Sequence, residues 1–393
     1  MSFDRELLTA ALPAYEIGDE LGQGGMGVVI SGQHRGLGRR VAIKQLPVAF
    51  AADPAVRRRF TEEARVLASL DHPHVVPVYD FVERDGVCLL VMEHLSGGTL
   101  RSRVADGSGF PPPRAAAVCL AAVSGLAAAH RRGVLHRDVK PENMLFAASG
   151  VLKVADFGIA KVLGGAVTAL TRRGDVIGTV DYMAPEQVRG GELSPATDVY
   201  AAATMLYELF AGVLPFPEDV QAEEVALLFR HAYEKPVPLP DVAPDVPDLV
   251  AAVVMRALET DPADRFETAE AFGVALAGAA TSAWGEGWLA AERVPIMDAG
   301  PIIAAAGHAT APPRGQDAPV AADGAIAPAG PAPPGKGAAG EGAAGKGLAS
   351  RRGLIVGAVI AVAVIALVAI LLFGHVFTVY SNGAGPWRLP PLR

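Results

Sequence analysis

Short apolar runs, each interrupted by glycine, proline or charged residues, dominate the first quarter of the chain. Five of them are rich in β-branched residues and predict strands: YEIGDELG, GVVISGQ, RRVAIKQL, VVPVYDFVE and VCLLVMEHL. Between the third and fourth runs, PAVRRRFTEEARVLASL repeats its apolar residues at the helical period and predicts a helix over residues 55–70. We therefore expect a strand-rich lobe with one helix at residues 15–95, preceded by an extension at residues 1–14.

From about residue 112 to residue 280 the pattern is mostly helical. PPRAAAVCLAAVSGLAAAHRRG begins with prolines and ends at a glycine, as helices commonly do. ATDVYAAATMLYELFAG is apolar on nearly every side, which predicts a helix buried at the centre of a domain. A larger, mainly helical lobe at residues 96–280 is therefore expected to follow the strand-rich lobe, giving a two-lobed α+β fold.

The chain then changes character twice. Residues 281–350 are rich in Ala, Gly and Pro, lack a hydrophobic period, and predict a linker that does not fold alone. Residues 354–373, LIVGAVIAVAVIALVAILLF, are twenty uncharged, mostly apolar residues, and as a helix they would span about 30 Å, the thickness of a bilayer core. This run predicts one transmembrane helix.

Basic residues indicate how that helix would be oriented. Lys336, Lys346, Arg351 and Arg352 precede the predicted span, and only Arg388 and Arg393 follow it. The excess of positive charge on the N-terminal side places the two lobes in the cytoplasm and residues 374–393 outside, as a short tail. Within the run GLIVG, two glycines in GxxxG spacing would allow two copies to dimerise: Gly353 and Gly357.

Composition excludes some other classes of protein. The 393 residues carry a net charge of −8, which gives no basic footprint for nucleic acid. The two cysteines, Cys88 and Cys119, lie in apolar stretches without metal-ligand spacing, and they predict buried thiols in a reducing compartment. The N-terminus, MSFDRELLTAALPAY, carries acidic residues and lacks the features of a secretory signal.

Three features in the strand-rich lobe indicate phosphate chemistry. In LGQGGMGVV the glycines follow GxGxxG spacing, which lets backbone amides approach phosphate oxygens. A dinucleotide-binding turn is the alternative, but it requires a helix after the glycines, whereas GVVISGQ continues as a strand.

Lys44 closes the strand VAIK, and Glu63 lies on the inward stripe of the helix 55–70, beside Leu67 and Leu70. A carboxylate on a buried stripe requires a cation, and Lys44 is the predicted partner.

Two further motifs lie in the helical lobe. HRDVKPEN combines Asp138, Lys140 and Asn143 within six residues, and DFG places Asp156 directly after the apolar strand VLKVA. Carboxylate and amide oxygens are the hard ligands that Mg²⁺ prefers when it is shared with phosphates, so Asn143 and Asp156 form a candidate metal site.

These motifs, together with GTVDYMAPE at residues 178–186 and DPADRF at 261–266, give the chain its resemblance. It resembles the protein kinases, and specifically the bacterial, eukaryotic-like Ser/Thr kinases with a membrane anchor, over about residues 15–275. The resemblance implies the two-lobed kinase fold, Mg-ATP as the cofactor (with Mn²⁺ as an alternative metal), and proteins with Ser or Thr hydroxyls as substrates.

The resemblance also assigns roles. Asp138 would orient the acceptor hydroxyl and take its proton, Lys140 would neutralise the transferring phosphoryl group, and Asn143 and Asp156 would bind the metal. Lys44, positioned by Glu63, would hold the α- and β-phosphates. The residues that the resemblance places around ATP are Leu21, Gly22, Gln23, Gly24, Gly25, Met26, Gly27, Val28, Val29, Ala42, Lys44, Met92, Glu93, Leu95 and Leu145.

Other residues would have regulatory and structural roles by the same resemblance. Arg137 would receive a phosphate from the activation segment, where Thr168 and Thr171 are the candidate autophosphorylation sites. Lys140 and Thr179 favour a Ser/Thr kinase over a tyrosine kinase. Three residues are expected to brace the helical lobe: Glu186 paired with Arg265, and Asp198 anchoring the backbone of the catalytic loop.

Three rival interpretations remain beside a membrane-tethered kinase in signal transduction. A catalytically weak, pseudokinase-like membrane scaffold would be expected to lack Lys44, Asp138, Asn143 or Asp156, all of which are present. A kinase for small molecules is disfavoured by the complete GTVDYMAPE segment. A structural receptor would have only the short outer tail with which to receive a ligand.

Overall fold

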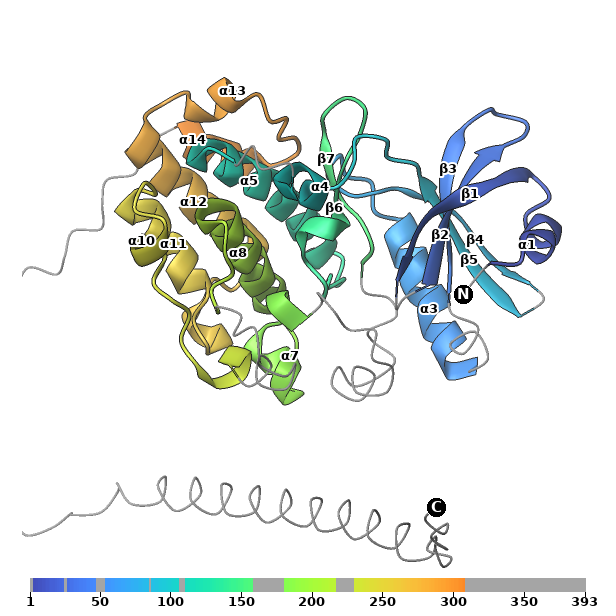
Figure 1. The fold of residues 1–393 in the computed structure, drawn as a ribbon, viewed down its shortest axis with the longest axis horizontal. Coiled ribbons are helices and arrows are strands. Elements are labelled where there is room, and N and C mark those ends of the chain that lie inside the picture. The colour runs from blue at the N-terminus through green and yellow to red at the C-terminus, as the bar shows by residue number, and fades with distance from the viewer. Residues whose placement is uncertain are drawn as a thin grey trace, which may run out of the picture. The chain divides into compact units, whose positions relative to one another are not determined.

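The computed structural model describes residues 3–24, 27–46, 54–84, 86–105, 110–157, 180–216 and 230–307. All of these residues belong to one compact unit, residues 1–317. The predicted transmembrane helix, the outer tail and Gly353 and Gly357 lie outside the described residues. Within the described unit, a sheet with α1 (Arg5–Ala11) and α3 (Pro54–Ala68) beside it lies at one end, and most of the helices lie at the other, as Figure 1 shows. The two-lobed α+β architecture predicted from the sequence is confirmed.

The N-terminal lobe is a five-stranded antiparallel sheet in the order β1-β2-β3-β5-β4. Its strands are β1 (Tyr15–Gly24), β2 (Gly27–His34), β3 (Arg40–Gln45), β4 (Val78–Arg84) and β5 (Val87–Glu93). Successive side chains of a strand point to opposite faces, so β5, buried along nearly its whole length, divides its residues between two cores.

Each face of β5 contributes to a different core. Val87, Leu89 and Val91 join the apolar residues that α1 (Arg5–Ala11) covers with Leu8. Cys88, Leu90 and Met92 join the larger core, which continues into the helical lobe. Helix α3 (Pro54–Ala68) contributes to that second core through Ala64 and Leu67, while the side chains of Val56 and Phe60 lie outside the described residues.

The C-terminal lobe is built on two buried helices. Helix α5 (Pro112–His130) is buried from Ala115 to Ala129, and α8 (Pro195–Ala211) is buried over most of its length. Helices α5, α8 and α12 (Ala269–Trp284) pack against one another, with α11 (Asp248–Ala257) alongside α8 and α12 (Figure 1). Among the described residues, only α5 is long and apolar enough to cross a membrane, and it is instead the core helix of this lobe.

Short elements complete the lobe and carry much of the chemistry. They are α4 (Leu100–Ala105), η1 (Pro141–Asn143), β6 (Met144–Phe146), β7 (Leu152–Val154), η3 (Val180–Tyr182), α7 (Pro185–Arg189), α10 (Leu239–Val242) and η4 (Pro262–Asp264). Strands β6 and β7 pair antiparallel, with Met144 opposite Val154. This hairpin places the residue before β6 and the residue after β7 at the same end.

The predicted start of the linker at residue 281 is wrong. Helix α12 runs on to Trp284, and two more helices follow: α13 (Trp288–Glu292) and α14 (Gly300–Gly307). Trp288 is 4% exposed and Ile302 is 1% exposed, so this segment buries apolar side chains against the lobe. The composition was misleading because alanine, abundant here, also packs well where helices approach closely.

Candidate active site

The glycine-rich stretch forms the connection between β1 and β2. Gly22 lies opposite Val29 and Gly24 opposite Gly27, so the residues that flank the turn belong to paired strands. Gly27 has a φ of 121°, and a Cβ there would overlap the carbonyl oxygen of Gln45 on β3. Only glycine suits that position, because β2 and β3 approach each other so closely. Gly25 and Met26, at the tip, lie outside the described residues.

Lys44 lies on β3 between Val29 on β2 and Leu90 on β5. Its Nζ is 3.0 Å from Oδ1 of Asp156, and the Lys44 side chain is only 12% exposed. Asp156 has a φ of 56°, in the left-handed region that non-glycine residues seldom occupy. With this backbone conformation, the carboxylate of Asp156 in the C-terminal lobe faces the ammonium group of Lys44 in the N-terminal lobe.

The catalytic-loop backbone is anchored by Asp198 at the start of α8. Oδ2 of Asp198 accepts from the backbone N–H of His136 at 2.8 Å, and Oδ1 accepts from that of Arg137 at 2.7 Å. Nε2 of His130 lies 2.7 Å from Oδ2. Burial alone would raise the pKa of Asp198, but the hydrogen bond and charge of His130, with those of His136, hold this pKa below its usual value. The structure therefore places Asp198 where the resemblance puts it.

Asp138 is 8% exposed and lies among donors from its own loop. Nζ of Lys140 lies 3.0 Å from Oδ2 of Asp138, and Nδ2 of Asn143 donates to the same oxygen at 3.2 Å. These two donors hold the carboxylate of Asp138 in one orientation. HRDVKPEN therefore brings Asp138, Lys140 and Asn143 into direct contact.

The two predicted metal ligands, Asn143 and Asp156, lie at the same, open end of the β6–β7 hairpin. Asn143 precedes β6, and its carbonyl oxygen accepts from the N–H of Ala155, adjacent to Asp156, at 2.9 Å. Nε2 of His136 hydrogen-bonds to the carbonyl oxygen of Ala155 at 2.8 Å, so Ala155 is also held by the catalytic loop. Nδ2 of Asn143 also donates to the carbonyl oxygen of Asp138 at 2.7 Å, so the amide oxygen is the atom left to face a cation.

This donor set fits Mg²⁺ with bound phosphates. Asn143 and Asp156 supply one amide oxygen and one carboxylate, which suits an ion that takes few protein ligands and completes its shell with water and phosphate. Among the described residues there is no cluster of three His, Cys, Asp or Glu side chains, the arrangement that an all-protein metal site would need.

The predicted Lys44–Glu63 ion pair is not formed, because both side chains have other partners. Oε1 of Glu63 lies 3.3 Å from Nη1 of Arg137, while Lys44 pairs with Asp156. Burial raises the pKa of Glu63, and the Arg137 guanidinium offsets part of this effect. The prediction failed because the helical stripe shows only that Glu63 faces inward, and two cations lie on that side.

Five of the residues that the resemblance places around ATP border the same apolar core. Ala42 lies opposite Met92 on neighbouring strands, and both belong to the larger core. Val29, Leu95 and Leu145 are partly buried against the same core, so a planar ring would meet apolar side chains from both lobes. Three other residues predicted around ATP lie in β1 and β2: Leu21, which is 50% exposed, Gln23, and Val28, which is 8% exposed and belongs to the core that α1 covers.

Glu93, at the end of β5, also lies beside this region. Its backbone N–H donates to the carbonyl of Pro77 at 3.1 Å. Its carboxylate lies 2.8 Å from Nζ of Lys153 on β7. This ion pair links the end of β5, where the chain passes into the C-terminal lobe, to β7, the strand that precedes Asp156.

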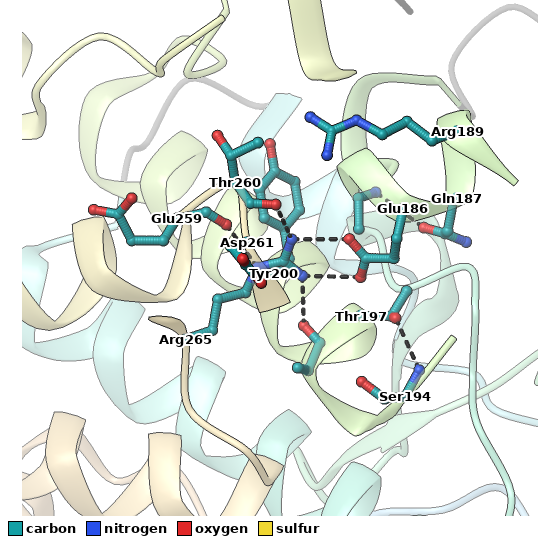
Figure 2. Close-up of polar contacts among 12 residues, drawn as sticks. Glu186, Gln187, Arg189, Ser194, Thr197, Tyr200, Glu259, Thr260, Asp261 and Arg265 are labelled. Atoms are coloured by element: carbon teal, nitrogen blue, oxygen red, sulfur yellow. Dashed lines mark hydrogen bonds and ion pairs between the residues drawn. The ribbon is translucent and has the colours of Figure 1, made fainter. Parts of the chain in front are cut away.

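Glu186 and Arg265 form a buried ion pair, which Figure 2 shows. Nη1 and Nη2 of Arg265 donate to the two carboxylate oxygens at 2.9 and 2.8 Å. The same guanidinium donates to the carbonyl oxygens of Glu259, Thr260 and Ala196. Both side chains are buried with their hydrogen-bonding capacity largely used, so the pair connects α7, the start of α8 and η4 into one rigid unit.

Sequence reasoning missed a second polar network around Arg101 on α4. Nε of Arg101 donates to Glu142 in the catalytic loop at 2.7 Å, and Nη1 donates to Glu208 on α8 at 2.6 Å. Tyr182 of η3 donates to Glu208 and accepts from Arg101. No local pattern indicates this network, because its members come from four separate segments that only the fold brings together.

The regulatory threonines Thr168, Thr171 and Thr179 lie outside the described residues. Their proposed partner Arg137 is described, with a φ of 64° and its guanidinium beside Glu63. Any role of the threonines stays a prediction from the sequence.

Comparison with known proteins decides the family. The family model of the protein kinase domain matches residues 15–274, about two thirds of the chain. The chain belongs to the protein kinase family. Membership implies the use of ATP with a divalent metal. It also accounts for the order in which the glycine-rich strands, Lys44, the catalytic loop and Asp156 follow one another.

Several curated relatives of this kinase domain are bacterial. It is 39% identical over 263 residues to a probable serine/threonine-protein kinase of Corynebacterium efficiens, covering 65% of this chain and 39% of that protein. It is 38% identical over 259 residues to serine/threonine-protein kinase PknB of Mycobacterium tuberculosis, covering 65% of this chain and 41% of that protein. It is 37% identical over 256 residues to PrkC of Bacillus subtilis, covering 65% and 39%. The matched part spans about two fifths of the length of these relatives.

Solved kinase structures share the fold. The crystal structure of the PknI kinase domain of Mycobacterium tuberculosis matches with a TM-score of 0.53 at 33% identity, covering 67% of this chain and 95% of that one. The structure of Rad53 residues 1–466 in complex with AMP-PNP matches with a TM-score of 0.54 at 25% identity, covering 66% and 64%.

Proposed function

We propose that the chain is a serine/threonine protein kinase that transfers the γ-phosphate of Mg-ATP to Ser and Thr hydroxyls of proteins. The observation that supports this most directly is the contact set of the catalytic loop. The carboxylate of Asp138 contacts Lys140 and Asn143. The backbone of Asn143 accepts a hydrogen bond from Ala155, and the next residue, Asp156, pairs with Lys44. The names of the bacterial relatives support the same class of substrate.

Each side chain has a separate task in this proposal. Asp138, held by its loop donors, accepts a hydrogen bond from the acceptor hydroxyl, orients its oxygen towards the phosphorus and takes its proton. Lys140 offsets the negative charge that builds up on the transferring group, and Lys44 holds the non-transferring phosphates. Bound Mg²⁺, held by Asn143 and Asp156, would supply positive charge to the phosphate oxygens. Alignment and charge stabilisation supply most of the acceleration in phosphoryl transfer.

Regulation is proposed to act through Arg137. A phosphate on Thr168 or Thr171 would carry nearly two negative charges and compete with the single charge of Glu63 for the same guanidinium. Autophosphorylation of the activation loop would thereby reposition α3 and order the loop. The role of Thr179 as a marker of Ser/Thr specificity belongs to the same proposal.

Anchoring in the membrane is proposed from the sequence. Residues 354–373 would cross the bilayer once, with the kinase domain in the cytoplasm and residues 374–393 outside. Dimerisation through Gly353 and Gly357 would bring two kinase domains together and favour autophosphorylation between copies. A cytoplasmic kinase tethered in this way suits signal transduction at the membrane.

The proposal is tested by incubating the purified chain with γ-labelled ATP, Mg²⁺ and a mixture of proteins. We expect label on serine and threonine of the chain and of the added proteins, and none with Lys44→Met or Asp138→Asn. The exposed variant Asp245→Asn serves as the control for an Asp-to-Asn change that leaves transfer intact. Nucleotide binding by the wild-type chain without any transfer would favour the alternative of a pseudokinase-like membrane scaffold.

A further inference from the structure

The segment 285–307, which we call the C-terminal strap, lies beyond residues 15–274 that match the kinase family. It returns across the helical lobe after α12 (Figure 1). Its apolar anchors are Trp288, Ala299, Ile302 and Ala306, each at most 5% exposed. Thr281 of α12 fixes both halves of the strap, because its Oγ1 accepts from Nε1 of Trp288 and donates to the carbonyl oxygen of Ala306. The strap is therefore an integral part of the lobe.

The middle of the strap reaches the loop between α3 and β4. The backbone N–H of Met297 donates to Nε2 of His74 in that loop at 2.9 Å, although the two residues are 223 positions apart. The carbonyl oxygen of Met297 accepts from Oγ of Ser124 on α5 at 3.2 Å. Both backbone groups of Met297 are thus held by side chains from distant elements, and the neighbouring Asp298 has a φ of 54°. A non-glycine residue in the left-handed region persists only where its surroundings hold it.

His74 transmits this contact to the strand that precedes Asp156. Since Nε2 accepts a hydrogen bond from Met297, Nδ1 carries the ring hydrogen and donates to the carbonyl oxygen of Leu152 on β7 at 2.7 Å. The carbonyl oxygen of His74 accepts from the N–H of Val154 at 2.9 Å. His74 is fully buried, so the neutral ring is the form that this environment favours. One residue thereby joins the strap to both ends of β7.

We propose that the strap positions Asp156 for metal binding, with His74 as the positioning residue between Met297 and β7. The inference rests on the proposed kinase function. Val154 is two residues before Asp156, and the same loop follows α3, which carries Glu63. Without the strap, the His74 ring would lose its hydrogen bond to Met297 and keep only the one to Leu152. His74 would then hold β7, and with it the position of Asp156, less firmly.

Two substitutions interrupt this path at different points without touching the metal ligands. Met297→Pro removes the N–H that His74 accepts, and Met297→Ala keeps it and serves as the matched control. His74→Asn keeps a donor at the position of Nδ1, facing Leu152, but does not reach Met297. A third variant, Gly273→Val, acts on the strap itself, because a Cβ there would lie 2.7 Å from Cδ1 of Ile302 and 3.0 Å from Cγ1 of Val123.

The readout is the affinity of the full-length chain for a fluorescent ATP analogue, measured with Mg²⁺ and with a chelator. We expect Met297→Pro and His74→Asn each to weaken binding in Mg²⁺ by about fivefold, a typical energetic coupling between distant sites. Binding in chelator and binding by Met297→Ala should match the wild type. In the double variant the two losses should not add, because both interrupt one path.

Several outcomes would overturn the inference. Equal weakening with and without Mg²⁺ would indicate general destabilisation, and unchanged Mg²⁺-dependent affinity would remove the strap from metal binding. If Met297→Pro does not fold, His74→Asn and Gly273→Val decide the same question. Failure of the wild-type chain to bind nucleotide in Mg²⁺ would instead count against the proposed kinase function.

Discussion

Glu63 on α3 lies 3.3 Å from Arg137 of the catalytic loop, Oε1 to Nη1. This contact gives the inward-facing carboxylate a cation from the C-terminal lobe, and it leaves Lys44 to Asp156 at 3.0 Å. While Arg137 is paired with Glu63, its guanidinium is not available to a phosphate on the activation segment. The carboxylate and the phosphate would compete for the same donors. The contact between Glu63 and Arg137 therefore links the position of α3 to the phosphorylation state proposed for the loop.

Arg137→Gln should abolish stimulation of the kinase by autophosphorylation. We expect the phosphorylated wild-type chain to exceed the phosphatase-treated chain by about tenfold in kcat, the equivalent of one charge-assisted hydrogen bond of about 1.5 kcal/mol. In Arg137→Gln the ratio should fall to about one, because the neutral amide binds neither charge. The exposed Arg132→Gln is the control. Full stimulation in Arg137→Gln would show that the phosphate acts elsewhere.

Asp138→Asn and Lys44→Met should differ in their kinetics although both suppress transfer. Asp138→Asn removes the proposed proton acceptor but keeps the size of the side chain, so kcat should fall by about 10²- to 10⁴-fold with the KM for ATP little changed. Lys44→Met removes the charge that is proposed to hold the phosphates, so the KM for ATP should also rise. Steady-state kinetics with a protein substrate checks both. An Asp138→Asn variant with a tenth of wild-type kcat would be incompatible with the role of Asp138.

Arg265→Ala should destabilise the C-terminal lobe strongly. The Arg265 side chain is fully buried and that of Glu186 is 8% exposed, so removing the arginine leaves an unpaired buried carboxylate. We expect a loss of about 3–5 kcal/mol in the free energy of unfolding, measured by urea denaturation. The exposed pair of Arg131 and Glu270 offers a matched control, since Arg131→Ala should cost about 0–1 kcal/mol. Equal losses at the two sites would refute the structural role of the buried pair.

Acidification should destabilise the kinase domain through His231. Burial lowers the pKa of His231 from 6.5 to about 4, and Nδ1 of its ring donates to the carbonyl oxygen of Met183 at 3.0 Å. Because the pKa is lower in the folded state, the stabilising contribution is complete above pH 6.5 and is lost as the pH falls through about 4. The full loss is about 3 kcal/mol.

His231→Asn is the variant that isolates this effect. It keeps a donor at the position of Nδ1 and does not titrate, so its free energy of unfolding should depend less on pH between 6.5 and 4 than that of the wild type. Urea denaturation at several pH values measures this slope. Identical pH dependence in the two proteins would assign the acid sensitivity to other groups.

Local patterns in the sequence predicted the parts of this protein whose contacts are short in range. The apolar run of β5 indicated a strand, and the apolar surface of α8 indicated a central helix, because secondary structure and burial follow from periodicity. Asp138, Lys140 and Asn143, which the sequence places within six residues, lie in direct contact, since a loop of six residues leaves little freedom.

Only the tertiary structure decided the contacts that cross between segments. Glu63 faces inward by its helical position, but its choice of Arg137 over Lys44 depends on how α3 lies against the catalytic loop. The contact of His74 with Met297 joins residues 223 positions apart in a segment whose composition indicated a linker. The sequence determines which side chains are apolar and which need a polar partner. The packing of whole elements determines which partner lies close enough, because the energy of a hydrogen bond or ion pair falls within a few ångströms.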